Sequence, residues 1–496
     1  MAAGTPNITR RSVLAGLAAP VFARAAAPPP NILYVMTDDQ SWQEMSCAGN
    51  RFLPTPNMDR LAKEGVRFAN CFCTNSLCAP SRATCLTGTY SHINGVRGNS
   101  EAADAPPEYI RREIPTYPEL LKKAGYRTAM IGKWHLADEP RGFDYSYILP
   151  GQGVYEDPDF IENGVRKKTK GYVTDLITNR ALEWLEHAGA GPWLLVYQHK
   201  APHRPFHPPP RLAKLLADTD LPYPATFDDD YATRKLAAQA KDMRLEISLA
   251  GDYPDLPTNL GPEERKRWIY QRFVKDHYRS TAGVDENLGR VLEYLDRHKL
   301  GEDTLIIYTT DNGYFLGEHG WYDKRFMYEP SLRLPLLVRY PRLIPAGQVD
   351  RHIVLNLDYA PTILDFAGAP APPSMQGRSL RPLVGAPSGL GAADWRGSML
   401  YTYYEDSWQL AGKGRDALRD PSFAYFTAHR VSPHRGVRAS RYKLIDYYRE
   451  NGYHELFDLE KDPEELRNVY GQPEYAAVQA ELARELRRLR QQYQAP

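Results

Sequence analysis

The sequence predicts an α/β protein with a largely parallel central sheet that is flanked by helices. The first observation is a set of short, almost continuously apolar runs, at residues 32–36, 128–131, 193–197 and 305–308. Such runs are typical of strands that are buried on both faces of a parallel sheet. The second observation is that segments with a helical apolar period lie between these runs, at residues 178–188 and 283–300. Alternation of strands and helices favours a parallel sheet over an antiparallel one.

Polar side chains follow each apolar run at the point where the predicted strand ends. They fall into four groups along the chain: Thr37, Asp38 and Asp39; Lys133 and His135; His199, Lys200 and His203; Asp311 and Asn312. Open α/β sheets bind their ligands beyond the carboxyl ends of their strands. We therefore expect these groups to meet in one functional site.

A second, smaller unit is predicted after a stretch rich in Gly, Pro and Ala at residues 384–393. Short strand-like runs follow at residues 399–404, 422–427, 436–446 and 453–458. The chain ends in a helical pattern with one apolar stripe, formed by Tyr475, Val478, Leu482, Leu486, Leu489 and Tyr493. This pattern predicts an antiparallel sheet covered by one helix. We therefore expect the mature chain to consist of two units, residues 29–390 and residues 391–496.

The N-terminal segment has the features of an export signal. Arg10 and Arg11 precede a short apolar run at residues 13–22, and a small-residue site follows at Ala23-Arg24-Ala25. Paired arginines before such a run are typical of a Tat-type signal, and a merely basic tail is the alternative. We expect residues 1–28 to direct the protein through the Tat machinery to a periplasmic or extracellular location.

Composition and hydropathy argue against two classes of partner. The 496-residue chain has a formal net charge of +1, so no global field directs it to nucleic acid or to an anionic membrane surface. The apolar run in the signal is too short to span a bilayer, and no later segment is long enough. We expect neither a nucleic-acid partner nor a membrane span.

The five cysteines, at positions 47, 71, 73, 78 and 85, raise the question of what Cys78 does. The spacing C-x-C-x4-C-x6-C of the last four matches none of the usual zinc or iron–sulfur patterns. Tat cargo folds in a reducing cytoplasm, so a required disulfide among the other cysteines is not expected. A tyrosine-phosphatase loop has five residues between its Cys and Arg, whereas three separate Cys78 from Arg82. A buried structural thiol is the remaining alternative.

The segment "CAPSRATCLTG", residues 78–88, resembles the first signature of the type I sulfatases, C-x-P-S-R followed by L-T-G. "GYRTAMIGKWHL", residues 125–136, resembles their second signature. "MTDDQ", "DNGYFLGEHGWYDKRFMYE" and "ELFDLEKDPEELRNVY" extend the resemblance along the chain in the family's order. It implies the alkaline-phosphatase-like α/β fold, and it implies that a maturating enzyme converts Cys78 to Cα-formylglycine.

The resemblance also implies roles for the residues around Cys78. One hydroxyl of the formylglycine hydrate attacks sulfur and releases the alcohol, and the other hydroxyl then drives elimination of sulfate. Arg82 orients the hydrate, while Lys133 and Lys324 place positive charge on the sulfate oxygens. A helix that begins near Pro80 directs its N-terminus toward the anion.

Two histidines complete the implied catalytic set. His135 is the implied base for the elimination step, and either His203 or Lys324 is the implied acid for the leaving oxygen. Three neighbours in the same run have weaker claims: His199, Lys200 and His207.

Asp38, Asp39, Asp311 and Asn312 offer only hard oxygen ligands. This donor set suits Ca²⁺ or Mg²⁺ better than zinc. The resemblance favours Ca²⁺, with Mg²⁺ as the alternative, and it implies that residue 78 also contacts the metal. Because the ligands come from two strand ends far apart in sequence, the fold has to assemble this site.

The segments "HKAPHRPF" and "FLGEHGWYDKRFMYE" are most similar to sulfatases that act on glycosaminoglycan or mucin-type sugars. A proline-rich loop after His203 predicts a stiff wall around a pocket for one terminal sugar, and hence exo action; its prolines are Pro205, Pro208, Pro209 and Pro210. A basic run in the C-terminal unit is a candidate for binding a sugar carboxylate, although a solvated strand face is favoured: His434, Arg435, Arg438 and Arg441.

Three alternative functions stay open at this point. Formylglycine-dependent relatives also hydrolyse phosphonate monoesters and phosphodiesters, and others act on aryl or choline sulfates. An inactive, exported sugar-binding protein is the alternative outside the enzymes. That alternative requires a broken catalytic set, and the sequence lacks none of the expected residues.

Overall fold

The computed structural model describes the following parts of the chain: residues 1–2, 28–99, 107–385, 394–404 and 431–496. Three predictions fall outside these residues: most of the export signal 1–28, the strand-like run 422–427 and the boundary at residue 390. Among the described helices, none combines the length and the apolar character that crossing a bilayer requires.

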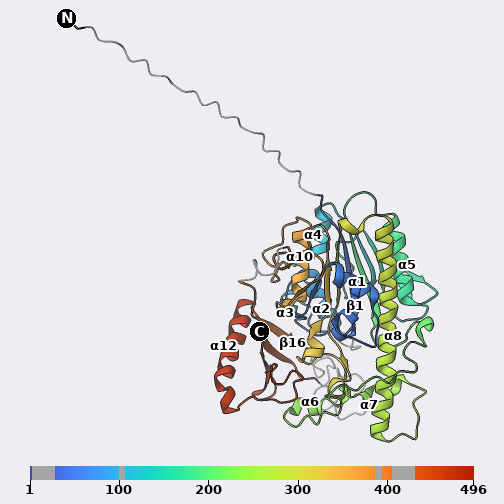
Figure 1. Ribbon diagram of the computed structural model, residues 1–496, viewed down its shortest axis with the longest axis vertical. Coiled ribbons are helices and arrows are strands. Elements are labelled where there is room, and N and C mark those ends of the chain that lie inside the picture. Colours follow the sequence, from blue (N-terminus) through green and yellow to red (C-terminus); the bar gives the residue numbers. More distant parts are fainter. Residues whose placement is uncertain (3–27, 100–106, 386–393, 405–430) are drawn as a thin grey trace.

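A ten-stranded sheet forms the centre of the molecule, in the order β14-β2-β13-β9-β1-β8-β4-β5-β6-β7 (Figure 1). The four apolar runs lie in the adjacent strands β9, β1, β8 and β4, which pair in parallel as predicted. Toward the edges the sheet is mixed, because β13, β6 and β7 pair antiparallel to their neighbours. The strands are β1 (Asn31–Asp38), β2 (Val66–Phe68), β4 (Arg127–Lys133), β5 (Tyr145–Leu149), β6 (Asp159–Glu162), β7 (Val165–Lys168), β8 (Trp193–Pro202), β9 (Thr304–Thr310), β13 (Leu336–Arg339) and β14 (Gln348–Asp350).

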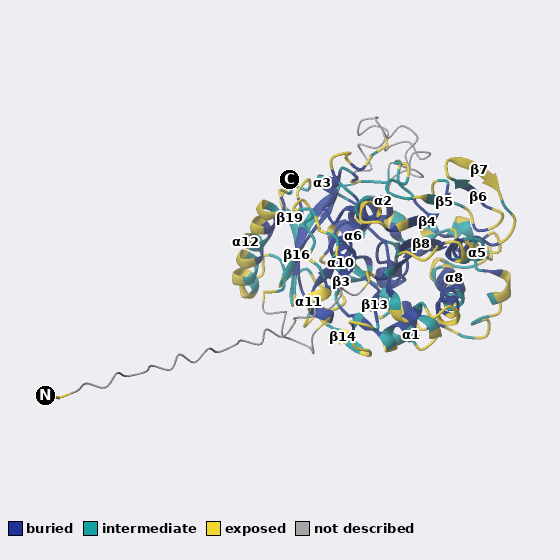
Figure 2. Ribbon diagram, turned by 90° about the horizontal axis from the view of Figure 1, so that it is seen from above, coloured by how far each residue is buried: buried dark blue, intermediate teal, exposed yellow. Residues whose placement is uncertain are grey.

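Helices cover both faces of this sheet, which explains why its central strands are apolar throughout. In β1, Ile32, Tyr34 and Met36 belong to one core cluster with α2, α4 and α10, while Leu33 and Val35 face α1, α5 and α8. Figure 2 shows these central strands as buried. The helices are α1 (Pro56–Glu64), α2 (Cys78–Thr87), α3 (Ser91–Asn94), α4 (Tyr117–Lys123), α5 (Val173–Glu186), α6 (Lys235–Gln239), α7 (Leu245–Ser248), α8 (Pro262–Arg297), α9 (Glu329–Leu332), α10 (Tyr359–Phe366), α11 (Arg381–Val384) and α12 (Ala476–Gln492).

The helix predicted at residues 283–300 is only the second half of α8, which has 36 residues. The helix begins at Pro262, a residue favoured in the first turn because its missing N–H has no intrahelical partner there. The first half of α8 packs in a separate apolar cluster beyond the main sheet, with Phe273 and Val274 against Phe206. The prediction covered only the second half because the apolar residues of the two halves of α8 pack in different core clusters.

The C-terminal residues form a separate antiparallel sheet in the order β16-β17-β18-β19, covered by α12 as predicted. The run 436–446 was read as one strand, but it contains two strands joined by a turn at Ser440 and Arg441. These strands are β16 (Ser398–Tyr403), β17 (His434–Ala439), β18 (Tyr442–Tyr447) and β19 (Tyr453–Asp458). The described residues also form two smaller sheets. One has three strands, β3 (Cys71–Phe72), β12 (Arg333–Leu334) and β15 (Val354–Leu355), and the other has two, β10 (Phe315–Leu316) and β11 (Tyr322–Asp323).

Candidate active site

Cys78 is the first residue of α2, and its side chain is fully buried. The helix therefore begins two residues before the predicted start at Pro80. Pro80 is tolerated in this first turn because the first backbone N–H groups of a helix have no intrahelical acceptor. Gly88 ends the helix with φ of 63°, a left-handed conformation that glycine adopts without strain. The N-terminal amides of α2 are thus fixed next to residue 78.

The parallel pairing of β1 with β9 brings the acidic residues together. Thr37 is paired with Thr310, so Asp38 at the end of β1 and Asp39 directly after it lie beside Asp311 and Asn312, which follow β9. Asp38, Asp39 and Asp311 each offer an oxygen, and these three atoms lie within 4.8 Å of one another. Asn312 Nδ2 donates to Asp39 Oδ1 at 2.7 Å, and the backbone N–H of Asp39 donates to Asp311 Oδ1 at 3.2 Å. The four predicted oxygen ligands are therefore in one buried cluster, and Cys78, the fifth predicted metal contact, offers its sulfur within 4.8 Å of an Asp38 oxygen.

The arrangement of these oxygens fits a divalent cation. Asn312 Oδ1 is buried and accepts no hydrogen bond in the described part of the protein. Burial, and next the charge of Asp38, raises the pKa of Asp311 to about 7. Burial and the same neighbour also raise the pKa of Asp39. Three crowded carboxylates with a spare amide oxygen favour a hard cation, which relieves their repulsion.

Cationic side chains surround the carboxylates. Lys133 pairs with Asp38, and Lys324 Nζ donates to Asp39 Oδ2 at 2.6 Å. Burial opposes ionisation of Asp38, but Lys133 and other cations outweigh it and hold the pKa of Asp38 well below its usual range. Lys324 Nζ is also 3.4 Å from Cys78 Sγ, which makes it a direct neighbour of the predicted nucleophile.

Arg82 is buried one turn after Cys78 and connects three strand ends. Its Nη2 lies 2.9 Å from Asp311 Oδ2, and its Nη1 donates to the Lys133 carbonyl at 2.8 Å. Nη1 also donates to Gln198 Oε1 at 2.6 Å. Arg82 therefore holds the nucleophile helix against β9, β4 and β8.

The predicted histidines take different positions. His203 Nε2 lies 3.7 Å from Asp39 Oδ2, and His203 offers a ligand atom within 4.8 Å of Asp38 and Cys78. Burial, and next the charge of Lys133, lowers the pKa of His203 well below its usual value. His135 lies two residues beyond Lys133 at the end of β4, with φ of 53°, and its role stays a prediction.

His199, Lys200 and His207, the three neighbours with weaker claims, also lie in different places. His199 is buried inside β8 with its ring against Tyr197. Lys200 is buried near the site, and its Nζ lies 5.0 Å from the centroid of the Tyr155 ring. Burial, and next the charge of Lys133, lowers the pKa of Lys200 to about 7. His207 lines a different cavity.

Sequence reasoning missed Gln198 and Tyr155. Gln198 is the last residue before the polar group at the end of β8, so its position in the sequence was a usable signal for the contact with Arg82. Tyr155 holds the loop after β8 by donating to the His203 carbonyl at 2.6 Å. It comes from a segment between β5 and β6 that carries no motif, so no sequence signal identified it.

All five cysteines are free thiols in this structure. Cys71 Sγ contacts the Tyr359 hydroxyl at 3.1 Å, and Cys73 Sγ contacts the Ser331 carbonyl at 3.8 Å. Burial raises the pKa of the Cys78 thiol well above its usual value. An unmodified thiol at this position is therefore protonated at neutral pH and is a weak nucleophile.

The basic run of the C-terminal sheet is partly solvated, because Arg438 is buried whereas the Arg441 side chain is 38% exposed. Its three arginines pair with acidic residues of the protein itself: Arg435 with Asp446, Arg438 with Glu329 and Arg441 with Asp458. His434 is buried, and its Nδ1–H donates to the Ser432 carbonyl at 2.9 Å. The charges of this run are compensated within the protein, and its role at a substrate rim stays a prediction.

The C-terminal sheet instead reaches the active site through Tyr401 of β16. The buried Tyr401 hydroxyl donates to the Arg325 carbonyl at 2.7 Å and accepts from the backbone N–H of Ser76 at 3.1 Å. Ser76 lies two residues before Cys78, and Arg325 directly follows Lys324. One hydroxyl therefore connects the two loops that place Cys78 and Lys324 at their 3.4 Å separation.

Replacing Tyr401 with phenylalanine is expected to lower kcat about fivefold, because a buried hydrogen bond contributes about 1 kcal/mol to the arrangement it holds. Steady-state kinetics with thermal unfolding measures both effects. Tyr447→Phe is the matched control, because this hydroxyl donates to Glu455 within the same apolar cluster and touches neither loop. Equal kcat losses in both variants would assign Tyr401 a purely structural role.

Comparisons with known proteins agree with this geometry. A family model described as Sulfatase matches residues 30–369, and one described as N-sulphoglucosamine sulphohydrolase, C-terminal, matches residues 409–492. An N-acetylglucosamine-6-O-sulfatase of Bacteroides thetaiotaomicron is 40% identical over 536 residues, covering 97% of this chain and 91% of the relative.

Two solved structures show the same fold over nearly the whole chain. A protein in complex with its substrate D-glucosamine-2-N,6-O-disulfate aligns at 39% identity with a TM-score of 0.84, covering 94% of this chain and 98% of the other. A phosphonate monoester hydrolase of Agrobacterium radiobacter aligns at 23% identity with a TM-score of 0.71, covering 94% and 96%. The family match over more than half of the chain, together with the 40% identical relative, shows that this protein belongs to the Sulfatase family of hydrolases.

Proposed function

We propose that this protein is an exo-acting carbohydrate sulfatase that removes a 6-O-sulfate from a terminal glucosamine unit. The observation that carries the proposal is the geometry at residue 78: a buried helix-start cysteine 3.4 Å from Lys324, beside three carboxylates that offer oxygens within 4.8 Å of one another. The substrate class is supported by the 40% identical N-acetylglucosamine-6-O-sulfatase and by the relative bound to a glucosamine disulfate.

Residue 78 acts after oxidation of its thiol to formylglycine by a maturating enzyme, and the hydrated aldehyde supplies the hydroxyl nucleophile. The raised pKa of the Cys78 thiol supports this step, because the cysteine itself is protonated in its buried position. A serine in its place would form a sulfate ester that water has to hydrolyse at sulfur, whereas the hydrate releases sulfate by elimination.

The side chains around residue 78 bind and polarise the sulfate group. Lys133 and Lys324 place two positive charges on its oxygens. Arg82 fixes the helix that carries residue 78 next to the strand ends. Burial lowers the pKa of His203, so its imidazole is neutral and a poor proton donor at neutral pH, whereas Lys324 stays protonated. This difference favours Lys324 as the acid for the leaving oxygen.

The metal is Ca²⁺, with Mg²⁺ as the alternative. Asp38, Asp39, Asp311 and Asn312 are the residues that hold it, and their oxygens match the ligands that hard cations prefer. When bound, the cation neutralises the crowded carboxylates and lowers the pKa of a hydroxyl at residue 78.

The protein acts outside the cytoplasm after Tat-dependent export. The twin arginines and short apolar run at the N-terminus support this location. Sulfated glycans are polymers of the extracellular space, so an exported enzyme meets them directly.

A substrate panel tests the proposed function. We expect kcat/KM for glucosamine 6-sulfate to exceed that for choline sulfate on the order of a hundredfold, which corresponds to about 3 kcal/mol of transition-state discrimination. The panel includes nitrophenyl sulfate, a phosphonate monoester and an intact sulfated polymer. Faster turnover of the phosphonate would favour the runner-up activity, and fast release of internal sulfates from the polymer would contradict exo action.

A further inference from the structure

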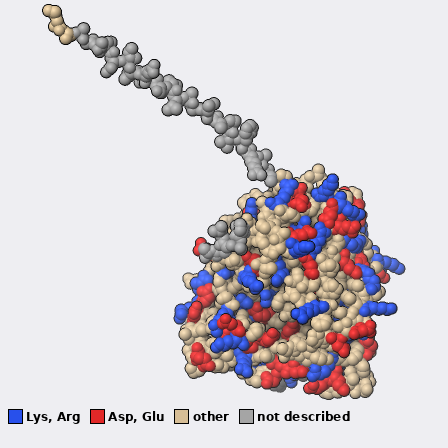
Figure 3. Space-filling view, viewed as in Figure 1, with Lys and Arg blue, Asp and Glu red and all other residues tan. Residues whose placement is uncertain are grey.

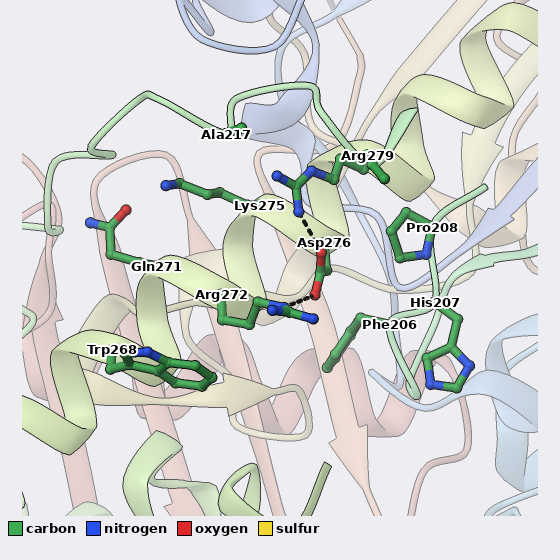
Figure 4. A pocket seen from close by; sticks show the side chains of 11 residues that line it. Phe206, His207, Pro208, Ala217, Trp268, Gln271, Arg272, Lys275, Asp276 and Arg279 are labelled. Carbon is green, nitrogen blue, oxygen red and sulfur yellow. Dashed lines mark hydrogen bonds and ion pairs between the residues drawn. The ribbon is translucent and has the colours of Figure 1, made fainter. Parts of the chain in front are cut away.

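A cavity of about 610 Å³ lies between α8 and the segment 206–217 (Figure 4), and among the catalytic and metal-binding candidates only His207, which had a weaker claim, lines it. Its residues on α8 recur every three or four positions, so they form one face of the helix: Trp268, Arg272, Lys275 and Arg279. Phe206, His207 and Pro208 of the proline-rich loop line it from the other side. Its volume is within the range of about 300–1,000 Å³ that is usual for small-molecule sites.

The cavity carries an excess of positive charge. Asp276 is its acidic residue, and this carboxylate is shared by Arg272 Nε at 2.8 Å and Arg279 Nη1 at 2.7 Å. Figure 4 shows both guanidinium groups directed toward Asp276. Lys275 makes no hydrogen bond or ion pair in the described part of the chain, so its amine is available to an external anion. On the face seen in Figure 3, acidic and basic side chains are mixed.

Aromatic rings give the cavity a second recognition element. Trp268 is half-buried, and an edge contact with Tyr253 at 5.9 Å between ring centroids supports its orientation. The Gln271 amide bonds both the N–H and the carbonyl of Leu221, which fixes the chain at the rim. A supported aromatic face beside an unpaired cation suits a sugar ring that carries a negative group.

The cavity adjoins the active site through the proline-rich loop. His207 follows His203 by four residues, so their Cα atoms are at most about 14 Å apart. The Phe206 ring lies 6.5 Å from that of Tyr314, and Lys324 Nζ lies 5.7 Å from the centroid of Tyr314. The buried rings of Phe206 and Tyr314 stand between the cavity and Lys324, so a chain bound at both places has to pass around them.

We propose that this cavity is an accessory binding site for a sugar unit that carries a sulfate or carboxylate group, in the same oligosaccharide as the terminal substrate sugar. Lys275 binds the anionic group, and Trp268 packs against the ring. The inference rests on the proposed function for the class of substrate. It predicts that the enzyme prefers short anionic oligosaccharides over the free monosaccharide.

The decisive experiment measures binding of a sulfated tetrasaccharide with glucosamine 6-sulfate at its non-reducing end. Isothermal titration calorimetry uses the full chain with Cys78→Ala, so that no turnover occurs. Adding Lys275→Glu is expected to raise Kd about tenfold, because one charge-assisted contact is lost. Trp268→Ala is expected to weaken binding as well. Lys123→Glu, the same substitution at an exposed position on α4, is the matched control.

The second readout is the ratio of kcat/KM for the tetrasaccharide to kcat/KM for glucosamine 6-sulfate. This ratio is expected to fall about tenfold in Lys275→Glu and to stay constant in Lys123→Glu. A Kd that is the same with and without Lys275→Glu, or is raised equally by Lys123→Glu, overturns the accessory site. If the wild-type enzyme releases no sulfate from glucosamine 6-sulfate, the proposed function fails, but the Kd comparison still decides the role of the cavity.

Discussion

Replacing Cys78 with alanine is expected to abolish sulfatase activity and to leave the fold intact. The loss in kcat/KM should be on the order of 10⁴-fold or more, because the variant lacks the atom that attacks sulfur. The fold should persist because alanine favours the helical position and because only the thiol group is removed, at a cost of about 1 kcal/mol. Desulfation kinetics and far-UV circular dichroism measure the two effects.

Two variants make this result specific. Cys85→Ala removes another buried thiol of α2, so its stability should fall by a similar amount while its activity is kept. Cys78→Ser should complete at most one turnover and retain a sulfate ester that mass spectrometry detects on the peptide with residue 78. Full activity in the Cys78→Ala variant would show that residue 78 is not the nucleophile.

The central fold was predictable because its strands are apolar on both faces. The runs at residues 32–36 and 305–308 place side chains alternately in the core clusters on either side of the sheet, and only a strand buried by helices on both faces needs such a run. The edge strands were not predicted. β7, for example, has the sequence VRKK and is fully exposed, so hydropathy does not distinguish it from a loop.

The acidic cluster was predictable for a geometric reason: parallel neighbours end at the same edge of a sheet, so residues after β1 and β9 meet. The basic run in the C-terminal sheet was not, because the sequence does not reveal that Arg438 faces Glu329 across more than a hundred residues. Tyr401 was missed for a similar reason. Its role depends on two backbone groups, and backbone groups leave no trace in the sequence.

Removing the charge of Asp311 is expected to lower kcat/KM on the order of 10³-fold, since bound metal contributes several kcal/mol to transition-state stabilisation. Asp311→Asn keeps the shape of the side chain and an oxygen that accepts from Arg82, so the domain should fold. Chelation of the wild-type protein should produce a comparable loss, and Ca²⁺ should reverse it in the wild type but not in the variant. Thr309, on the same strand, offers Thr309→Ser as a control that alters no proposed ligand.

The carboxylate of Asp311 should also make the stabilisation of the fold by bound metal vary with pH. In the metal-free protein, the pKa of Asp311 is raised from 3.8 to about 7, mainly by burial. Between these values the folded state binds more protons than the unfolded state, so the contribution of Asp311 to stability is lost as pH rises toward 7. A cation replaces the proton and restores that stability, and its binding releases protons. The increase in Tm on adding Ca²⁺ should therefore be larger at pH 8 than at pH 5, and Asp311→Asn should reduce this difference. An equal increase at both pH values in wild-type protein would show that Asp311 does not exchange a proton for the metal.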